Sequence, residues 1–247
     1  MEIINFYKKN GETPLEALQR FKAEQPQYKN SALTYAGRLD PLAEGVLLIL
    51  VDADENQKKK ILDLSKQYYF EILWGFETDS LDLLGKAKLV SSGFPGDQKL
   101  SEAMAKLRNL EEMPYPVFSS KTVSGKPLWQ WAREKRLSEI EIPVGKSEIF
   151  SLKKLKDYEI SSEELLQTVR EMVNLVRGDF RQEEILDLWQ GLLKESRSFW
   201  ISCFKAEVGS GTYIRNLADF LGRELWIGAV CFKIVRERVG DYSILGL

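Results

Sequence analysis

The stretch that decides the fold of this chain is Tyr35–Leu50, YAGRLDPLAEGVLLIL. Asp40 stands between Gly37 and Pro41 in a predicted turn, and the apolar run Val46–Val51 follows it. Glycine permits unusual backbone angles, whereas proline fixes the angle after Asp40 and removes an amide donor. The apolar run has the length and the β-branched content of a buried strand. The pattern predicts one acid displayed on a rigid loop against a buried strand, although aspartate before proline is also typical of a plain turn cap.

The composition excludes several kinds of catalysis. The 247 residues include no histidine, which removes Ser-His and Cys-His mechanisms. Two cysteines, Cys203 and Cys231, cannot form a four-ligand zinc site. Gly209-Ser210-Gly211 lacks the third glycine of a dinucleotide fingerprint, and the chain has no Walker loop. We therefore expect catalysis by carboxylate, Tyr, Lys or Arg side chains and backbone amides, with no metal and no cofactor.

Net charge, hydropathy and the cysteines together indicate the cellular compartment of the protein. The net charge of −2 argues against a strongly basic polyelectrolyte binder, but it allows a locally basic RNA site. The longest apolar runs have strand length, so no membrane span is expected, and Met1–Asn5 does not open a secretory signal. Two lone cysteines are typical of buried thiols in a reducing compartment. We expect a soluble, cytoplasmic, monomeric protein.

Hydrophobic periodicity predicts alternating strands and helices. Strands are expected over 3–7, 46–51, 68–74, 149–158 and 200–208. Helices are expected from Pro14, from Ser101, over 161–176, over 183–195, and from Asn216 to a stop at Gly222. Residues 25–35 are expected to be irregular, and 78–82 to form a polar turn.

A basic segment with interleaved aromatic residues lies between Pro114 and Arg136. Five cations stand against Glu134 alone, among them Lys121, Lys126 and Arg133, and Phe118, Trp129 and Trp131 interleave with them. Cations that neutralise phosphate and aromatic rings that stack on bases suit a nucleic acid. An ordinary surface helix above a tryptophan-anchored core explains this segment equally well.

Three separated segments resemble the TruB-type pseudouridine synthases. Gly37–Leu47 resembles the catalytic-aspartate motif of that family, and Gly211–Gly222 resembles its arginine motif. Tyr68 lies where the family has its active-site tyrosine. Weaker similarities are found at Lys8–Thr13, the opening motif; at Phe118–Lys121 and Gly125–Arg133, the RNA-gripping thumb; and at Arg236–Tyr242, which closes the catalytic domain.

The resemblance implies the fold and the domain organisation. It implies an α/β (α+β) fold with a mixed, mainly antiparallel sheet flanked by helices. Residues 1–247 would form a single catalytic domain, with a thumb at about 114–145 and a helical insertion at about 160–197. The C-terminal RNA-binding domain of many relatives is not expected.

The resemblance also implies a function, a tRNA pseudouridine-55 synthase acting on the T loop. Such an enzyme flips a uridine out of its stack, breaks its C1'–N1 bond and rejoins the uracil through C5. Asp40 would be the catalytic carboxylate, as nucleophile or proton abstractor, with Arg215 as a fixed positive charge and Tyr68 stacked on the base. The expected RNA contacts are Tyr35, Arg38, Phe118, Lys121, Lys126, Arg133 and Arg236.

Other interpretations stay open. Tyr35 replaces the usual histidine of the family, which puts RNA recognition in question, and a non-catalytic RNA-folding module on the same scaffold is the main alternative. Arg215 could pair with Asp219 four residues on, and Tyr68 could be a plain core aromatic. A carbohydrate enzyme with paired carboxylates would need a second acid near Asp40, and the sequence identifies none.

Overall fold

One mixed sheet organises the molecule. The computed structural model describes residues 1–246; Leu247, the last residue of the expected domain, lies outside the described residues. The sheet contains β1 (Glu2–Lys8), β2 (Leu33–Ala36), β3 (Ala43–Val51), β4 (Lys66–Trp74), β11 (Ile149–Ser161), β12 (Ser198–Val208), β13 (Ala229–Val239) and β14 (Tyr242–Ser243). The strand order is β1-β3-β13-β4-β12-β11, with β2 beside β3 and β14 beside β13. Strands β3 and β13 are parallel and the other pairs of this sheet are antiparallel, which confirms the predicted fold class.

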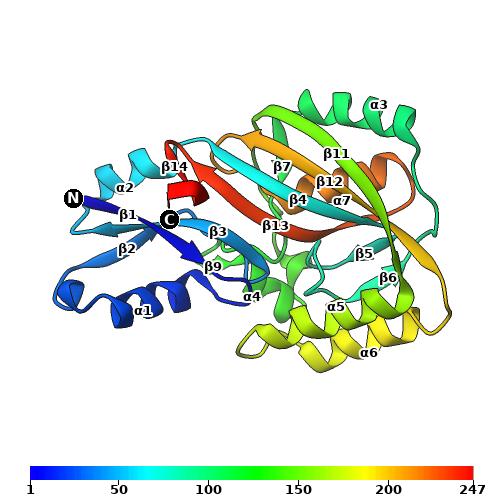
Figure 1. The fold of residues 1–247 in the computed structure, drawn as a ribbon, viewed down its shortest axis with the longest axis horizontal. Helices are drawn as coiled ribbons and strands as arrows, with labels where there is room; N and C mark the ends of the chain where they lie inside the picture. The colour runs from blue at the N-terminus through cyan, green and yellow to red at the C-terminus, as the bar shows by residue number, and fades with distance from the viewer. Residues whose placement is uncertain (247) are drawn as a thin grey trace.

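Helices cover the two faces of this sheet (Figure 1). One face packs against α3 (Asp97–Arg108) and α7 (Ile214–Glu224), and the other packs against the hairpin of α5 (Ser162–Leu175) and α6 (Gln182–Leu192). Successive side chains of a strand point to opposite faces. Accordingly Phe70 and Ile72 of β4 lie in the α3–α7 core, whereas Leu73 lies in the core under the α5–α6 hairpin.

The N-terminal part adds a third, smaller core around β3. Val46, Leu48 and Leu50 pack there with side chains from the helix α2 (Glu55–Leu62). Helix α1 (Pro14–Glu24) begins at a capping box of Thr13 and Glu16, as its sequence predicts. The short strands β5 (Phe76–Thr78) and β6 (Ala87–Leu89) form a small separate ribbon.

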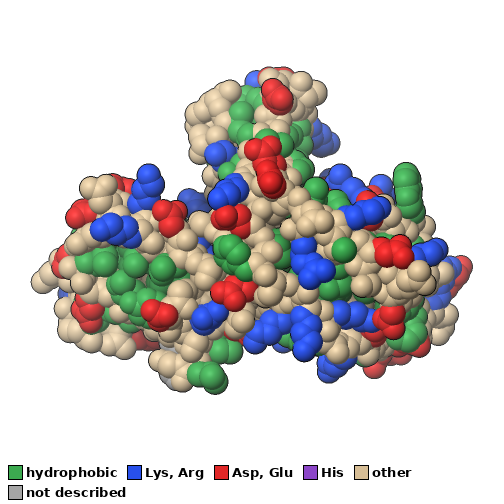
Figure 2. Space-filling model, turned by 90° about the horizontal axis from the view of Figure 1, so that it is seen from above, with side chains coloured by type: hydrophobic (Ala, Val, Ile, Leu, Met, Phe, Trp, Pro, Cys, Tyr) green, Lys and Arg blue, Asp and Glu red, His purple; other side chains and the backbone are tan. Residues whose placement is uncertain are grey.

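Residues 112–146 leave the sheet between α3 and β11. Their base is a ribbon of β7 (Glu112–Pro114) and β10 (Val144–Lys146), and their outer part holds β8 (Thr122–Val123), β9 (Lys126–Pro127) and α4 (Leu128–Arg133). This segment lies behind the sheet in Figure 1 and stands out from the body as a knob in Figure 2.

Several expectations from the sequence were wrong in detail. Residues 25–35 are not wholly irregular, because β2 starts at Leu33 and pairs with β3. Helix α3 begins at Asp97 rather than at Ser101. Gly222 does not stop α7, which continues to Glu224. A Cβ at Gly222 would lie 2.3 Å from the backbone nitrogen of Ala229, so this glycine serves the close packing of α7 against the start of β13. Across residues 1–246, no helix combines the length and the apolar character that a membrane crossing needs.

Candidate active site

Two buried cations hold the Asp40 loop from either side. Arg236 of β13 is 1% exposed. Its Nε donates to the carbonyl of Val46 at 2.7 Å, and its Nη atoms donate to the carbonyls of Arg38 at 3.3 Å and Gly37 at 3.2 Å. These donors of Arg236 are used inside the protein, where they fix the loop before and after Asp40. The expected contact of Arg236 with RNA stays a prediction.

Lys8 at the end of β1 is the second of these cations, and it is fully buried. Its Nζ donates to the carbonyls of Ala43 at 2.5 Å, Pro41 at 3.2 Å and Lys9 at 3.1 Å. Burial lowers the pKa of Lys8 to about 8, although the nearby charge of Asp40 opposes that shift. The sequence placed Lys8 in a weakly similar motif and assigned it no role.

Asp40 is paired with Arg215, which comes from the first turn of α7. Arg215 Nε donates to Asp40 Oδ2 at 2.7 Å and its Nη2 donates to Asp40 Oδ1 at 3.0 Å, across 175 residues of sequence. The Arg215 side chain is 2% exposed, whereas that of Asp40 is 32% exposed. The guanidinium also donates to the carbonyls of Ser80 at 2.5 Å and Phe118 at 3.2 Å. The alternative pairing with Asp219 is wrong, because Asp219 pairs with Arg223. A buried arginine that makes four hydrogen bonds therefore orients a carboxylate that stays partly exposed to solvent.

A second carboxylate lies against the same arginine. Asp82 Oδ2 is 3.9 Å from Arg215 Nε, and Asp82 Oδ1 accepts hydrogen bonds from Ser80 Oγ at 2.5 Å and the Leu84 amide at 3.0 Å. Burial raises the pKa of Asp82 from the usual 3.8 to about 6, against the opposing charge of Arg215. The sequence identified no second acid near Asp40, so this is a correction. The apolar residues Leu81, Leu83 and Leu84 around Asp82 were the available signal that this turn enters the core.

Tyr68 lies on the α3–α7 side of the sheet. The residue is 8% exposed and belongs to the same core cluster as Leu39 and Ile214, which directly precede Asp40 and Arg215 in the sequence. A small hollow beside Asp40 is lined by Leu42, Ala43, Asp82, Cys231, Phe232, Lys233 and Ile234. Both cysteines are buried free thiols, as expected.

The three cations of the projecting segment that were expected to contact RNA, Lys121, Lys126 and Arg133, each have a partner within the chain. The Lys121 Nζ lies 4.7 Å from the centroid of the Tyr115 ring, and Lys126 pairs with Glu134 at 2.6 Å. Arg133 donates to the carboxylate and to the carbonyl of Asp179, the latter at 3.1 Å. The other expected RNA contacts are Arg38, which is exposed and donates to Ser120 Oγ, and Tyr35, which is partly exposed on β2 opposite Ile49.

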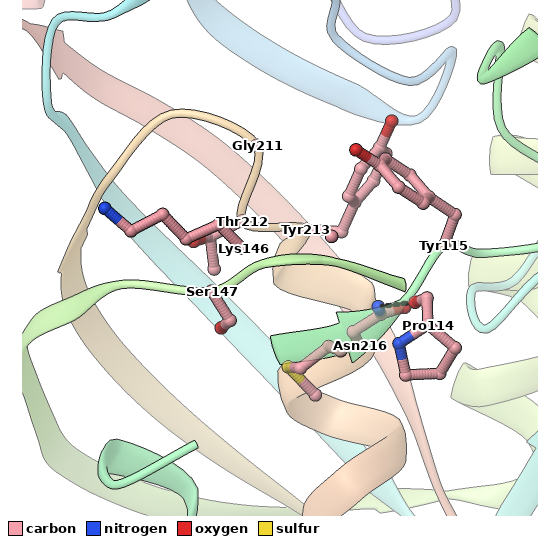
Figure 3. A pocket seen from close by; sticks show the side chains of 10 residues that line it. Pro114, Tyr115, Lys146, Ser147, Gly211, Thr212, Tyr213 and Asn216 are labelled. Carbon is pink, nitrogen blue, oxygen red and sulfur yellow. Dashed lines mark hydrogen bonds between the residues drawn. The ribbon is translucent and has the colours of Figure 1, made fainter. Parts of the chain in front are cut away.

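A second hollow lies where the projecting segment meets the start of α7 (Figure 3). Asn216 donates to the carbonyl of Pro114 at 2.6 Å, and the rings of Tyr115 and Tyr213 meet edge to face with centroids 5.8 Å apart. Lys146, Ser147, Gly211 and Thr212 complete the labelled lining of the hollow. These contacts attach the base of the projecting segment to the helix that carries Arg215.

Several known proteins resemble this chain in sequence. It is 27% identical to the tRNA pseudouridine synthase B of Caldicellulosiruptor saccharolyticus over 85% of its own length, and 27% identical to that of Aquifex aeolicus over 96%. The tRNA pseudouridine synthase B of Thermotoga petrophila is 26% identical over 98% of the chain. The chain spans 58%, 68% and 64% of the lengths of these three relatives.

A solved structure described as "Crystal Structure of a Cbf5-Nop10-Gar1 Complex" shares the fold. It superposes on 98% of this chain and 50% of its own chain with a TM-score of 0.59, at 16% sequence identity. The family model of the TruB family pseudouridylate synthase (N terminal domain) matches residues 26–182. That match covers more than half of the chain and includes the Asp40 loop and Asp82, and the chain therefore belongs to the TruB family of pseudouridylate synthases.

Proposed function

We propose that this chain is an RNA pseudouridine synthase that isomerises uridine to pseudouridine in the T loop of tRNA. The observation that carries the proposal is the two-bond pairing of Asp40 with the buried Arg215. The Asp40 side chain is 32% exposed although that of its partner Arg215 is 2% exposed, and a purely structural role of the pair does not require this exposure. A carboxylate that acts on a substrate must be exposed, because a reacting atom has to reach it.

The pairing supplies what the chemistry requires of the protein. The reaction exchanges a C1'–N1 bond for a C1'–C5 bond within one nucleotide. The proton that leaves C5 is matched by one taken up at N1, so no atom is gained or lost overall. Asp40 would act as nucleophile or as proton abstractor, while Arg215 keeps its two oxygens in one orientation. Tyr68 would stack on the flipped uracil. Extruding that base costs a few kcal/mol, which contacts with the rest of the RNA must offset.

The projecting residues, which we call the thumb (about 114–145), would grip the RNA. Phe118, Lys121, Lys126 and Arg133 would contribute stacking and phosphate contacts, with Arg38 and Tyr35 beside the Asp40 loop. The helical hairpin at about 160–197 would be an insertion into a single catalytic domain. Because Asp40 and Arg215 come from one chain, the site needs no second copy, and we propose a monomer that acts on the tRNA T arm in the cytoplasm without a metal.

The test is to incubate the purified chain with unmodified tRNA and to map pseudouridine by chemical labelling. We expect one modified uridine in the T loop, and none with Asp40→Asn, which keeps the shape of the side chain and loses its charge. Asp241→Asn, at an exposed turn, is the matched control and should retain activity. Binding of tRNA by the unaltered chain with no pseudouridine formed would refute the enzyme and would favour the RNA-folding module.

A further inference from the structure

The turn between α5 and α6 reaches the candidate active site. Two of its residues contact the thumb: Asp179 accepts from Arg133 of α4, and the guanidinium of Arg181 lies 4.4 Å from the centroid of the Phe118 ring. The opposite end of α5 does not share this role, since Ser162 bonds to the carbonyls of Glu195 and Arg197. The hydrogen bond to Arg133 and the cation–π contact with Phe118 both come from this turn.

Arg181 is held firmly in its place over Phe118. Its Nη atoms donate to the two carboxylate oxygens of Asp79 at 2.6 and 3.3 Å, and its side chain is 19% exposed. Asp79 is itself oriented by the amide of Lys86, which donates to Oδ1 at 2.9 Å. A planar guanidinium fixed by two hydrogen bonds presents its face to an aromatic ring more reproducibly than a lysine ammonium does.

Phe118 is therefore anchored from two sides. Its ring carries the Arg181 guanidinium, and its carbonyl accepts from Nη2 of Arg215, the nitrogen that also donates to Asp40 Oδ1. A shift of Phe118 would remove one partner of the arginine that orients the catalytic carboxylate. The α5–α6 turn is thus coupled to Asp40 through two successive contacts.

We propose that Arg181 is a positioning residue of the active site: it acts through Phe118 to hold the start of the thumb over the Asp40–Arg215 pair. This inference rests on the proposed function, in which Phe118 contacts the RNA. It gives the α5–α6 hairpin a role in the reaction, as the element that closes the thumb against the catalytic loop.

The test replaces Arg181 by asparagine and not by alanine. Arg181 has a φ of +64°, in the left-handed region that asparagine tolerates better than other non-glycine residues, so Arg181→Asn removes the guanidinium with little added strain. The matched control is Glu184→Gln, which removes an ion pair with Lys86 at 2.5 Å. This ion pair also links the hairpin to the β5–β6 ribbon, but it does not involve Phe118.

The first measurement is the single-turnover rate constant of pseudouridine formation with protein in excess over tRNA. Arg181→Asn should lower it by about two- to thirty-fold, the equivalent of one cation–π contact, and Glu184→Gln should leave it unchanged. If Arg181 acts through Phe118, the double variant Arg181→Asn/Phe118→Leu should have the same rate constant as Phe118→Leu alone. Equal losses in Arg181→Asn and Glu184→Gln, or fully additive losses in the double variant, would overturn the proposal.

The second measurement needs no activity: amide hydrogen exchange over residues 117–121. Arg181→Asn should speed exchange there, and Glu184→Gln should not. If the unaltered chain forms no pseudouridine, the proposed function fails, and the exchange experiment still decides whether Arg181 holds this segment. Unchanged protection of 117–121 in Arg181→Asn would refute the positioning role.

Discussion

At the scale of single residues, the site has two carboxylates and one guanidinium. The Asp82 side chain is 10% exposed and lies 3.9 Å from Arg215 Nε, whereas the side chain of Asp40 is 32% exposed. Two ionised carboxylates on one arginine would leave a net negative charge in a poorly solvated place, which is costly. The raised pKa of Asp82, about 6, means that Asp82 takes up a proton readily. Arg215 thus has one deeply buried carboxylate neighbour, Asp82, and one partly exposed partner, Asp40.

The raised pKa of Asp82 predicts a pH-dependent stability. Between its ordinary value of 3.8 and about 6 the native state binds more protons than the unfolded state, so this group makes the free energy of unfolding fall as the pH rises. Asp82→Asn lacks this contribution. The free energy of unfolding of the variant minus that of the unaltered protein should therefore rise by up to about 3 kcal/mol from pH 4 to pH 7. Urea titrations of both proteins at four pH values measure this difference. If the free energies of unfolding of the two proteins change in parallel with pH, the prediction is wrong.

The contacts of Arg215 predict that its shape matters as much as its charge. Arg215→Lys keeps the positive charge, but one ammonium cannot reach Asp40, Ser80 and Phe118 with the geometry of a planar guanidinium. We expect single-turnover pseudouridine formation to fall about 10²-fold, the scale of losing a positioned donor. Arg223→Lys, at an exposed position of the same helix, is the control. Activity of Arg215→Lys close to that of the unaltered protein would show that charge alone suffices.

At the scale of elements, the parallel pairing of β3 with β13 places the Asp40 loop. Ala43, Glu44 and Gly45 pair with Ile234, Val235 and Arg236, directly after the loop ends. Gly45 has a φ of +111°, and a Cβ there would lie 2.3 Å from the carbonyl oxygen of Arg236. The glycine thus lets β13 come close enough for the Arg236 side chain to reach back to Gly37 and Arg38.

Gly45 should therefore tolerate no side chain. Gly45→Ala adds both the strain of a positive φ and a backbone clash, and we expect the free energy of unfolding to fall by about 2 kcal/mol or more. The control is Gly191→Ala in α6, where nothing lies within 4 Å of the added methyl. That change should raise the free energy of unfolding by about 0.5–1 kcal/mol, as alanine does within a helix. Equal urea midpoints for the two variants would contradict the close-approach argument.

At the scale of the whole molecule, two of the thumb cations that we propose to bind RNA are already paired with carboxylates of the chain. The net charge is −2, and Lys126 and Arg133 of the thumb already pair with Glu134 and Asp179. Exposed ion pairs of this kind are worth little, so a phosphate can replace the carboxylate at small cost. Binding should then depend on a few local exchanges between thumb and RNA, with little long-range attraction.

The salt dependence of tRNA binding tests this picture. Each phosphate contact contributes about 0.7–0.9 to the slope of log affinity against log salt. Replacing Lys121, Lys126 and Arg133 together with alanine should flatten the slope by about 2–3 units. The control is an equal loss of charge at exposed lysines outside the thumb: Lys60, Lys99 and Lys194. A slope that the thumb variant leaves unchanged would assign its cations to an ordinary solvated surface.

The sequence by itself determined most of the helices and strands, and it identified the motifs that contain Asp40 and Arg215. The capping boxes at Thr13 and Ser161 and the apolar face of α5 predicted those helices, because caps and periodicity act within a few neighbouring residues. The Asp40 turn and the apolar run of β3 were also local signals, and glycine and proline left few other conformations there.

The tertiary structure alone decided how the charged residues pair. Arg215 had Asp219 within reach on its own helix, yet it pairs with Asp40 because the sheet brings α7 against the loop after β2. Arg236 was expected to contact RNA and Asp82 to lie in a polar turn, but both side chains are buried in the structure. Burial and partners of a charge depend on residues more than a hundred positions away, and no local propensity encodes them.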